Sequence, residues 1–400
     1  MSRSDGGEVQ RINTSLAQRV VDVRRYLHRN PELSNEERGT QRYLKSLLLE
    51  NGIEDVREVA GFGLAVDIVG AAANSNRKVA IRADIDALPI VETSGVEFSS
   101  QNDGVMHACG HDAHAAMVFG AAMHLHSIRD SFAGVVRLIF QPAEEAEPLG
   151  GRRVIEEGLL DDIDNAIGIH VDPYTPTGKM GVAAGPYSLA SDIFDVTVSG
   201  SPAHAAKPSE GVDAIAVACT MVSELQKIVS REIDPYDPLV VSITGIQGGG
   251  AYNVLADTVH IKGTVRSGHN STRKMATERI LQILEGIAAA HRAIVRFELT
   301  PGEPAVINDP AMTRILADAA GSIIGSENVL PLPGWTAADD FAFYSAKRPS
   351  VYFRLGIRNE AVGSVFPLHH PKFRVDEAAL PIGIDILCRA AISSLQATGE

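Results

Sequence analysis

The segment from Met106 to His114 places one thiol and three imidazoles within a few residues of one another. Cys109 and His111 are separated by one glycine, so their side chains point the same way if the chain is extended there. A cysteine beside histidines is more typical of a metal ligand or a nucleophile than of a structural thiol. His114 lies one turn further along if a helix has begun, where it either acts in the site or supports it as a buried hydrogen-bonding group.

Two adjacent glutamates, Glu144 and Glu145, offer a second kind of chemistry. Adjacent residues at the end of a strand project in different directions, so one carboxylate can bind a metal while its neighbour handles a proton. A metal ion acidifies its bound water, and a glutamate beside it can take the proton, as metal-assisted hydrolysis requires. The pair Glu156-Glu157, in an amphipathic pattern, instead indicates a solvated helix face.

The strands expected in the first half of the chain lead directly into these polar residues. The apolar runs and the side chains that follow them are 79–82 with Asp84 and Asp86, 135–140 with Gln141, Glu144 and Glu145, and 166–169 with His170. In open α/β sheets, ligands bind outside the carboxyl ends of the strands. We therefore expect carboxylates and imidazoles from several strands to meet at one edge of a sheet.

Helices alternate with these strands. Apolar residues at helical spacing predict helices over about 16–29, 36–50, 111–126 and 376–395. Between residues 187 and 300 the order changes to strand, helix, strand, strand, helix, strand, at about 193–198, 212–229, 239–246, 259–265, 273–290 and 294–299. The prediction is an α/β catalytic domain with a mixed, mostly parallel sheet, formed by residues 1–186 and 301–400, and an inserted α+β, ferredoxin-like domain over 187–300.

Further candidates lie outside the first cluster. His204 follows a strand of the expected insertion, and Gly248–Asn253 contains three glycines that suit either a close backbone approach or a flexible turn. His369 and His370 precede the last helix. Cys219 and Cys388 lie in apolar helical stretches, and we expect both in the core.

Composition limits the class of protein. The chain has 400 residues, 45% hydrophobic and 22% charged, and a net charge of −14, which disfavours nucleic acid and anionic membranes as partners. No apolar run reads as membrane-spanning, and the polar first residues lack the apolar core of a signal peptide. Three scattered cysteines do not form a disulfide framework. We expect a soluble cytoplasmic protein.

Six motifs in order make the sequence resemble a known family, over roughly residues 10–395. They are Arg82–Pro89, His107–His114, Gln141–Glu145, Gly168–Val171, Gly248–Asp257 and Leu368–Pro371. Together they resemble the aminoacylase, hippurate hydrolase and auxin-conjugate amidohydrolase family, a branch of the dinuclear-metal peptidases. The departures from the family pattern, at Ala146–Leu149 and Lys207–Ser209, fall where they could line a substrate pocket.

The resemblance implies a role for each matching residue. The implied metal ligands are Cys109, His111, Glu145, His170 and His369. His369 is preferred over His370 because the family pattern places the ligand directly after Leu368. Glu144 is the implied general base and Asp86 the acid that keeps the metal site in order, while His204 and Asn253 are implied to reach the substrate and help hold the oxyanion.

The activity implied is hydrolysis of N-acyl amino acids to a carboxylate and a free amino acid, by a metal-activated water. The resemblance also implies two divalent metal ions per subunit, zinc or manganese with cobalt or nickel as further options, and a homodimer formed through the inserted lid domain. A metal-dependent dipeptidase or carboxypeptidase is the alternative. A non-catalytic binding protein and a hydrolase that uses Cys109 as nucleophile also stay open.

Overall fold

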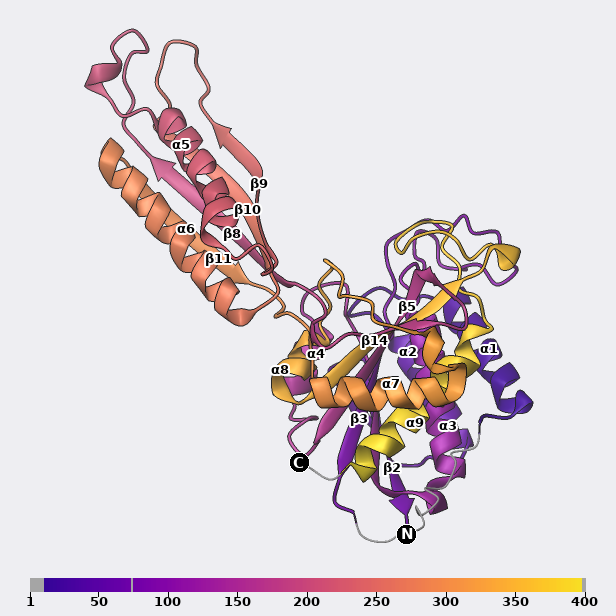
Figure 1. Cartoon of the computed structure of the whole chain (residues 1–400). Helices are drawn as coiled ribbons and strands as arrows, with labels where there is room; N and C mark the ends of the chain where they lie inside the picture. The colour runs from indigo at the N-terminus through magenta and orange to yellow at the C-terminus, as the bar shows by residue number, and fades with distance from the viewer. Residues whose placement is uncertain (1–10, 73–74, 398–400) are drawn as a thin grey trace. The chain divides into compact units, whose positions relative to one another are not determined.

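The computed structural model describes residues 11–72 and 75–397, and the chain divides into two compact units. The first unit comprises Met1–Gly185, Ile307–Gly334 and Asp340–Glu400. The second comprises Pro186–Val306 together with Trp335–Asp339, and the expected insertion over 187–300 falls inside it. Each unit has its own hydrophobic core, and Figure 1 traces the helices and strands that enclose these cores.

An eight-stranded mixed sheet forms the centre of the first unit. Its order is β1 (Val56–Val59), β2 (Gly63–Ala71), β4 (Ala133–Gln141), β3 (Lys78–Asp84), β5 (Asn165–Pro176), β14 (Ser350–Arg358), β6 (Met180–Gly181) and β13 (Val329–Leu330). The four central strands β4, β3, β5 and β14 run parallel, whereas β1, β2 and β4 pair antiparallel. The central parallel strands confirm the predicted mixed, mostly parallel sheet. They also bring the carboxyl ends of β3, β4 and β5 to one edge.

Helices and short helical turns complete the first unit. They are α1 (Thr14–Arg29), α2 (Arg38–Glu50), α3 (His111–Ser127), η1 (Arg129–Ser131), α4 (Gly150–Glu156), α7 (Pro310–Ile324), η4 (Ser326–Asn328), α8 (Ala342–Lys347), η5 (Glu360–Val362) and α9 (Ala379–Gln396). In Figure 1, α3, α7 and α9 lie across one face of the sheet, and their apolar residues join those of the strands in one core. The short helices α4 and α8 pack on each other and contact β4 and β14.

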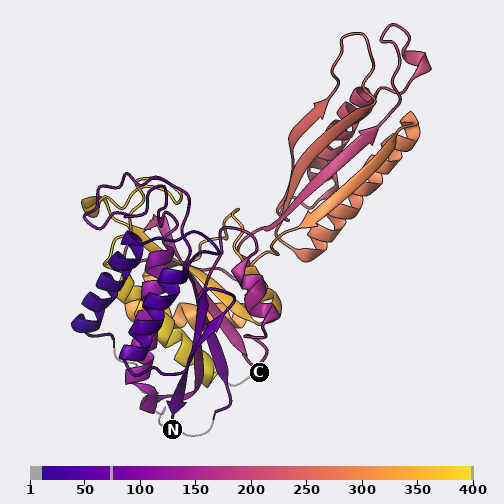
Figure 2. The same ribbon diagram turned by 180° about the vertical axis from the view of Figure 1, so that it is seen from behind.

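The second unit has the predicted ferredoxin-like order. Its elements are β8 (Ala190–Ser199), η2 (Pro208–Glu210), α5 (Ala214–Lys227), η3 (Ile228–Glu232), β9 (Leu239–Gly248), β10 (Thr258–Ser267), α6 (Asn270–His291) and β11 (Ile294–Pro301). The four strands form an antiparallel sheet in the order β11, β8, β10, β9. Helices α5 and α6 cover one face, and Figure 2 shows the other face of these strands without a helix. The short strands β7 (Gly185–Pro186) and β12 (Ile307–Asn308) lie where the chain passes between units.

Two expectations need correction. Cys388 is buried in α9 as predicted, but Cys219 is exposed, because α5 turns Val217, Ala218 and Met221 towards the sheet and Cys219 lies outside that stripe. The prediction that no apolar run is long enough to span a membrane also needs correction. Helix α9 is long and apolar enough to span a bilayer, yet 72% of it is buried, as expected for a core helix of this unit.

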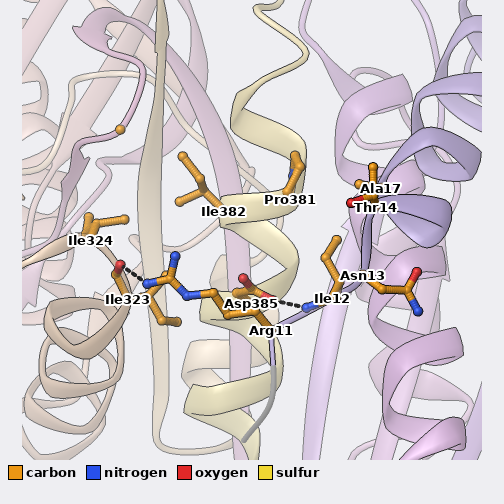
Figure 3. A pocket seen from close by; sticks show the side chains of 11 residues that line it. Arg11, Ile12, Asn13, Thr14, Ala17, Ile323, Ile324, Pro381, Ile382 and Asp385 are labelled. Atoms are coloured by element: carbon orange, nitrogen blue, oxygen red, sulfur yellow. Dashed lines mark hydrogen bonds between the residues drawn. The ribbon is translucent and has the colours of Figure 1, made fainter.

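A pocket of about 500 Å³ lies in the first unit between the start of α1, the end of α7 and the first half of α9 (Figure 3). Arg11 donates to the carbonyl of Ile323 at 2.6 Å, and the Ile12 amide donates to Asp385 at 3.0 Å. These two bonds fix the chain where it enters α1. None of the predicted site residues lines this pocket.

Candidate active site

The structure brings the predicted ligands of the first unit together. Three groups of side chains have ligand atoms within 4.8 Å of one another: Cys109 with His111 and His170, Cys109 with Glu145 and His369, and His111 with Glu144 and Glu145. The groups share members, so all five predicted ligands and the predicted base form one cluster. The cluster lies at the predicted carboxyl edge of the sheet, where β4 leads into the glutamates and β5 carries His170.

His111 is oriented with one ring nitrogen directed at the cluster. Its Nδ1 donates to the backbone carbonyl and a side-chain oxygen of Asp86, at 3.0 and 3.1 Å. Its Nε2 is buried and has no hydrogen-bond partner in the described part of the chain. An orphaned buried nitrogen is costly unless something binds it, and a metal-bound histidine has this arrangement, with its second nitrogen held by a carboxylate or carbonyl.

The residue between Cys109 and His111 must be glycine. Gly110 has φ of 92°, and a Cβ there would lie 2.5 Å from a methyl carbon of Val171. The chain therefore turns sharply between the thiol and the start of α3. This turn, rather than an extended chain as the sequence suggested, sets the directions of the two side chains.

His170 and Cys109 face each other across the cluster. His170 Nδ1 donates to the backbone carbonyl of Val171 at 2.8 Å, which leaves Nε2 3.4 Å from the Cys109 sulfur. Burial, and then the charges of neighbouring histidines, lower the pKa of His170 well below its usual value, so its ring is neutral, as a metal ligand must be. Burial and the nearby carboxylates of Glu145 and Glu144 raise the pKa of the Cys109 thiol, so a thiolate requires a cation beside it.

The two glutamates project from a tight turn after β4. Ala143, which precedes them, has φ of 49°, in the left-handed region. The amide of Glu145 donates to Asp86 at 3.0 Å, and the Glu145 carboxylate lies 3.2 Å from His369 Nε2. His369, itself at φ of 61°, is held by its amide, which donates to the carbonyl of Ala108 at 2.8 Å. Asp86 therefore supports both His111 and Glu145.

The cluster concentrates negative charge. Burial opposes ionisation of Asp84, but His111, His114 and Arg82 hold its pKa well below the usual value. Burial likewise opposes a charge on His111, yet Asp84, Asp86 and Glu145 raise its pKa to about 10. The same surplus of negative charge favours divalent cations. One sulfur, three imidazoles and carboxylate oxygen form a mixed donor set that suits zinc and related ions, so the residues present fit the implied metals.

A buried network that we did not predict from the sequence supports this edge. Arg82, fully buried, donates to Asp84 and to Asp340, each at 2.6 Å, and to Gln141 at 3.0 Å. His114 donates from Nδ1 to Asp84 at 2.6 Å and accepts the Val171 amide at Nε2, so it has the supporting role that the sequence left open. In the sequence, the one indication of this network is that Arg82 and Asp84 are separated by a single residue on a strand.

The two substrate residues expected in the insertion lie next to each other in the second unit. The backbone of His204 bridges that of Val254, and the Ala205 amide donates to the carbonyl of Asn253 at 2.9 Å. Both side chains are exposed. The Ala206 amide donates to His204 Nδ1 at 3.0 Å, which places the proton of a neutral ring on Nε2. His204 is thus prepared to donate a hydrogen bond.

Comparisons with known proteins agree with this geometry. Residues 80–393 match the peptidase family M20/M25/M40. The N-acetyl-L-cysteine deacetylase of Bacillus subtilis is 39% identical, over 92% of this chain and 86% of that protein, and thermostable carboxypeptidase 2 of Saccharolobus solfataricus is 38% identical, over 91% and 92%. The crystal structure of Bacillus subtilis YXEP, described as a dinuclear metal binding peptidase of the M20 family, superposes with a TM-score of 0.84 at 34% identity, covering 96% of this chain and 99% of that one.

The family match covers well over half of the chain, and the relatives match nearly all of it. The resemblance drawn from the six sequence motifs is therefore confirmed, as is the architecture of an α/β domain with an inserted lid domain. The chain belongs to the peptidase family M20/M25/M40 and is a metal-dependent amidohydrolase of that family.

Proposed function

We propose that the protein hydrolyses the amide bond of N-acyl amino acids and releases a carboxylate and a free amino acid. The observation that carries this proposal is the single cluster that the five proposed metal ligands form together with Glu144. The relatives named as N-acetylcysteine deacetylases support the choice of an acyl amino acid over other amides. Similarity to an IAA-amino acid hydrolase of Arabidopsis thaliana, 35% identical, points to the same bond type.

The metal ions would be held by Cys109, His111, Glu145, His170 and His369. When bound, they supply a Lewis acid that polarises the amide carbonyl and acidifies water. We expect zinc or manganese, with cobalt or nickel able to substitute in such a donor set. Asp86 fixes the ring of His111 and the amide of Glu145, so it orients two of the ligands.

Glu144 acts as the general base in this proposal. Its carboxylate takes a proton from the attacking water as the water oxygen bonds to the acyl carbon. The carbon–nitrogen bond then breaks, and Glu144 returns the proton to the leaving amine nitrogen. His204 donates from Nε2 to the carbonyl oxygen as negative charge grows there, and Asn253 beside it contacts the substrate.

A substrate panel tests the reaction. N-acetyl and N-benzoyl amino acids, with dipeptides alongside, are offered to enzyme that is untreated, chelated, or refilled with zinc or manganese. Acyl amino acid turnover that disappears on chelation and returns with metal is the expected result. A preference for dipeptides would favour the second candidate, a carboxypeptidase or dipeptidase, which the similarity to thermostable carboxypeptidase 2 supports. Turnover that survives complete chelation would favour Cys109 as a nucleophile.

Glu144→Gln tests the base, and Glu156→Gln, an exposed glutamate at the end of α4, is its matched control. We expect Glu144→Gln to lower kcat by roughly 10²- to 10⁴-fold with the metal content unchanged. Glu156→Gln should keep wild-type turnover. Near-wild-type kcat in Glu144→Gln with both ions bound would exclude the role.

We also propose a homodimer and a cytoplasmic location. The inserted unit ends its sheet in two edge strands, β9 and β11, which leave backbone groups available for pairing. The three cysteines are all thiols, as in reducing compartments. Light scattering of the purified protein tests the first point, and cell fractionation tests the second.

A further inference from the structure

The turn that presents Glu144 depends on groups outside it. Ala143 has a φ of 49°, a backbone conformation that is unfavourable for residues with a Cβ. Such a conformation persists only where the surrounding structure holds it. The amides on either side of Glu144 are each held by a carboxylate. The Ala143 amide donates to Glu37 Oε1 at 2.7 Å, and the Glu145 amide donates to Asp86 Oδ2 at 3.0 Å. Asp86 belongs to the metal site, whereas Glu37 has no role yet.

Glu37 is an unusual acid for a position at the start of a helix. Its side chain is fully buried, with a relative exposure of 0%. Its Oε1 accepts the amides of both Ala143 and Asn35, the second at 3.0 Å. Its Oε2 is also buried and has no hydrogen-bond partner among the residues that the structure describes. Burying a carboxyl group in this way is costly, so the contact with Ala143 needs an explanation.

Helix α2 does not provide that explanation. Glu37 occupies the position before the helix, but its side chain makes no capping hydrogen bond. The carboxylate of Glu32 caps the helix instead, because it accepts the amides of Gly39 and Thr40 at 2.9 and 2.7 Å. The buried carboxyl group of Glu37 is thus directed to the turn before Glu144.

The same segment also reaches Asp86. Ser34 donates to Asp86 Oδ2 at 2.7 Å, on the oxygen that accepts the Glu145 amide. Residues 34–37 therefore contact the turn on both sides of Glu144, through Glu37 directly and through Ser34 by way of Asp86. Burial raises the pKa of Glu37 to about 7, and the charge of Asp86 adds to this effect. The uncharged amide of glutamine, which has the same shape, is therefore a suitable replacement for the Glu37 carboxyl group.

We propose that Glu37 is a positioning residue for the general base: its buried Oε1 fixes Ala143 and thereby the direction in which Glu144 points. This inference rests on the proposed role of Glu144. Proton transfer requires the base within hydrogen-bond reach of the water, and a misplacement of about 1 Å can cost roughly 10²-fold in rate. The proposed ligand Glu145 is held separately by Asp86, so we expect metal binding to survive the loss of the Glu37 contact.

The test compares Glu37→Ala and Glu37→Gln, with the exposed neighbour substitution Glu36→Ala as control. Glu37→Ala removes the acceptor of the Ala143 amide, so we expect kcat to fall roughly 10²-fold while KM stays within about 3-fold and both metals stay bound. Glu37→Gln keeps the acceptor oxygen and should restore kcat to within about 5-fold of wild type. Glu36→Ala should leave kcat, KM and Tm unchanged.

Two results would overturn the inference. One is Glu37→Ala with a lower Tm but wild-type kcat per metal-loaded enzyme, which would mean a structural role alone. The other is loss of metal in Glu37→Ala, which would mean that Glu37 acts through the ligands. If Glu37→Ala fails to fold, Glu37→Asp decides, since it withdraws the oxygen by one methylene group. Wild-type kcat in that variant would also contradict the proposal.

A parallel assay of Glu144→Gln separates this inference from the proposed function. High turnover of Glu144→Gln would remove the base itself, whatever the Glu37 variants do. An inactive Glu144→Gln together with wild-type kcat in Glu37→Ala and Glu37→Asp would remove only the positioning role.

Discussion

The polar residues at the carboxyl edge of the large sheet differ in burial and in hydrogen bonding from those on the His204–Asn253 surface of the inserted unit. At the sheet edge, His111, His170 and Asp86 are at most 3% exposed, and each has its orientation set by a hydrogen bond. On the inserted unit, the side chains of His204 and Asn253 are exposed, and local backbone bonds and the bond from the Ala206 amide to His204 hold their segments. The sheet edge is buried and its side chains are held by hydrogen bonds, so it is the rigid region of the two. The His204–Asn253 surface is open to solvent.

The roles proposed above account for the difference. Hydrogen bonds orient the proposed metal ligands, so that an unbonded atom such as His111 Nε2 is directed at the cluster. His204, proposed as a donor to the oxyanion, can stay exposed to admit a substrate and needs only its tautomer set. Substitutions in the two regions should therefore fail in different ways.

The largest effect is expected from removing a ligand of the rigid region. His170→Ala should lose metal and lower kcat/KM by at least roughly 10³-fold, because the Lewis acid contributes several kcal/mol to the barrier. His126→Ala, a histidine in the last turn of α3, is the control. Metal analysis and turnover are measured together. Full activity in His170→Ala with only one ion bound would show that the two regions are less different than we infer.

His204→Ala should give the next largest effect and a different signature. We expect kcat to fall by about 10²- to 10³-fold, as on loss of an oxyanion donor, with the metal content unchanged. His260→Ala, an exposed histidine on β10, should be silent. Loss of metal in His204→Ala, or a kcat at the wild-type level, would contradict the inferred difference between the two regions.

Asp86→Asn should also weaken metal binding, but by less than His170→Ala does. The amide keeps an acceptor for His111 but loses the negative charge, and such changes to a ligand's partner cost roughly 10- to 100-fold in metal affinity or activity. Titrating the metal into the stripped variant should require a higher concentration for half-maximal activity. An unchanged titration curve would contradict the role of Asp86.

The smallest effect is expected at an ion pair outside both regions. Although partial burial opposes it, hydrogen bonds from Lys78 and Arg137 lower the pKa of Asp162 to about 2. This carboxylate stabilises the fold above its unfolded pKa of about 3.9, and the contribution is lost as the pH falls towards 2. Asp162→Asn should therefore lower Tm slightly at pH 7 and by much less at pH 2, with activity unchanged at pH 7. A difference in Tm that is independent of pH would refute this.

Strand ends alone predicted part of the rigid region, because the polar residues that follow β3, β4 and β5 are adjacent to those strands in the chain. The resemblance to a known family supplied the full ligand set, and Cys109, His111, Glu145, His170 and His369 do form one cluster. The strand–helix order of the insertion predicted its fold. Glu37 was not foreseen, since a glutamate before a helix looks solvated, and only folding brings it to Ala143. Cys219 was misplaced because an apolar stretch does not state which face of α5 meets the sheet.

Metal-dependent turnover of an N-acyl amino acid tests the central claim most directly. The stripped enzyme is titrated with zinc or manganese while hydrolysis of the best substrate of the panel is followed. We predict no turnover without metal and full activity once about two ions are bound per chain, as expected if the overlapping ligand groups hold two ions. Full activity of the stripped enzyme, or none with both ions bound and every substrate of the panel offered, would contradict the account.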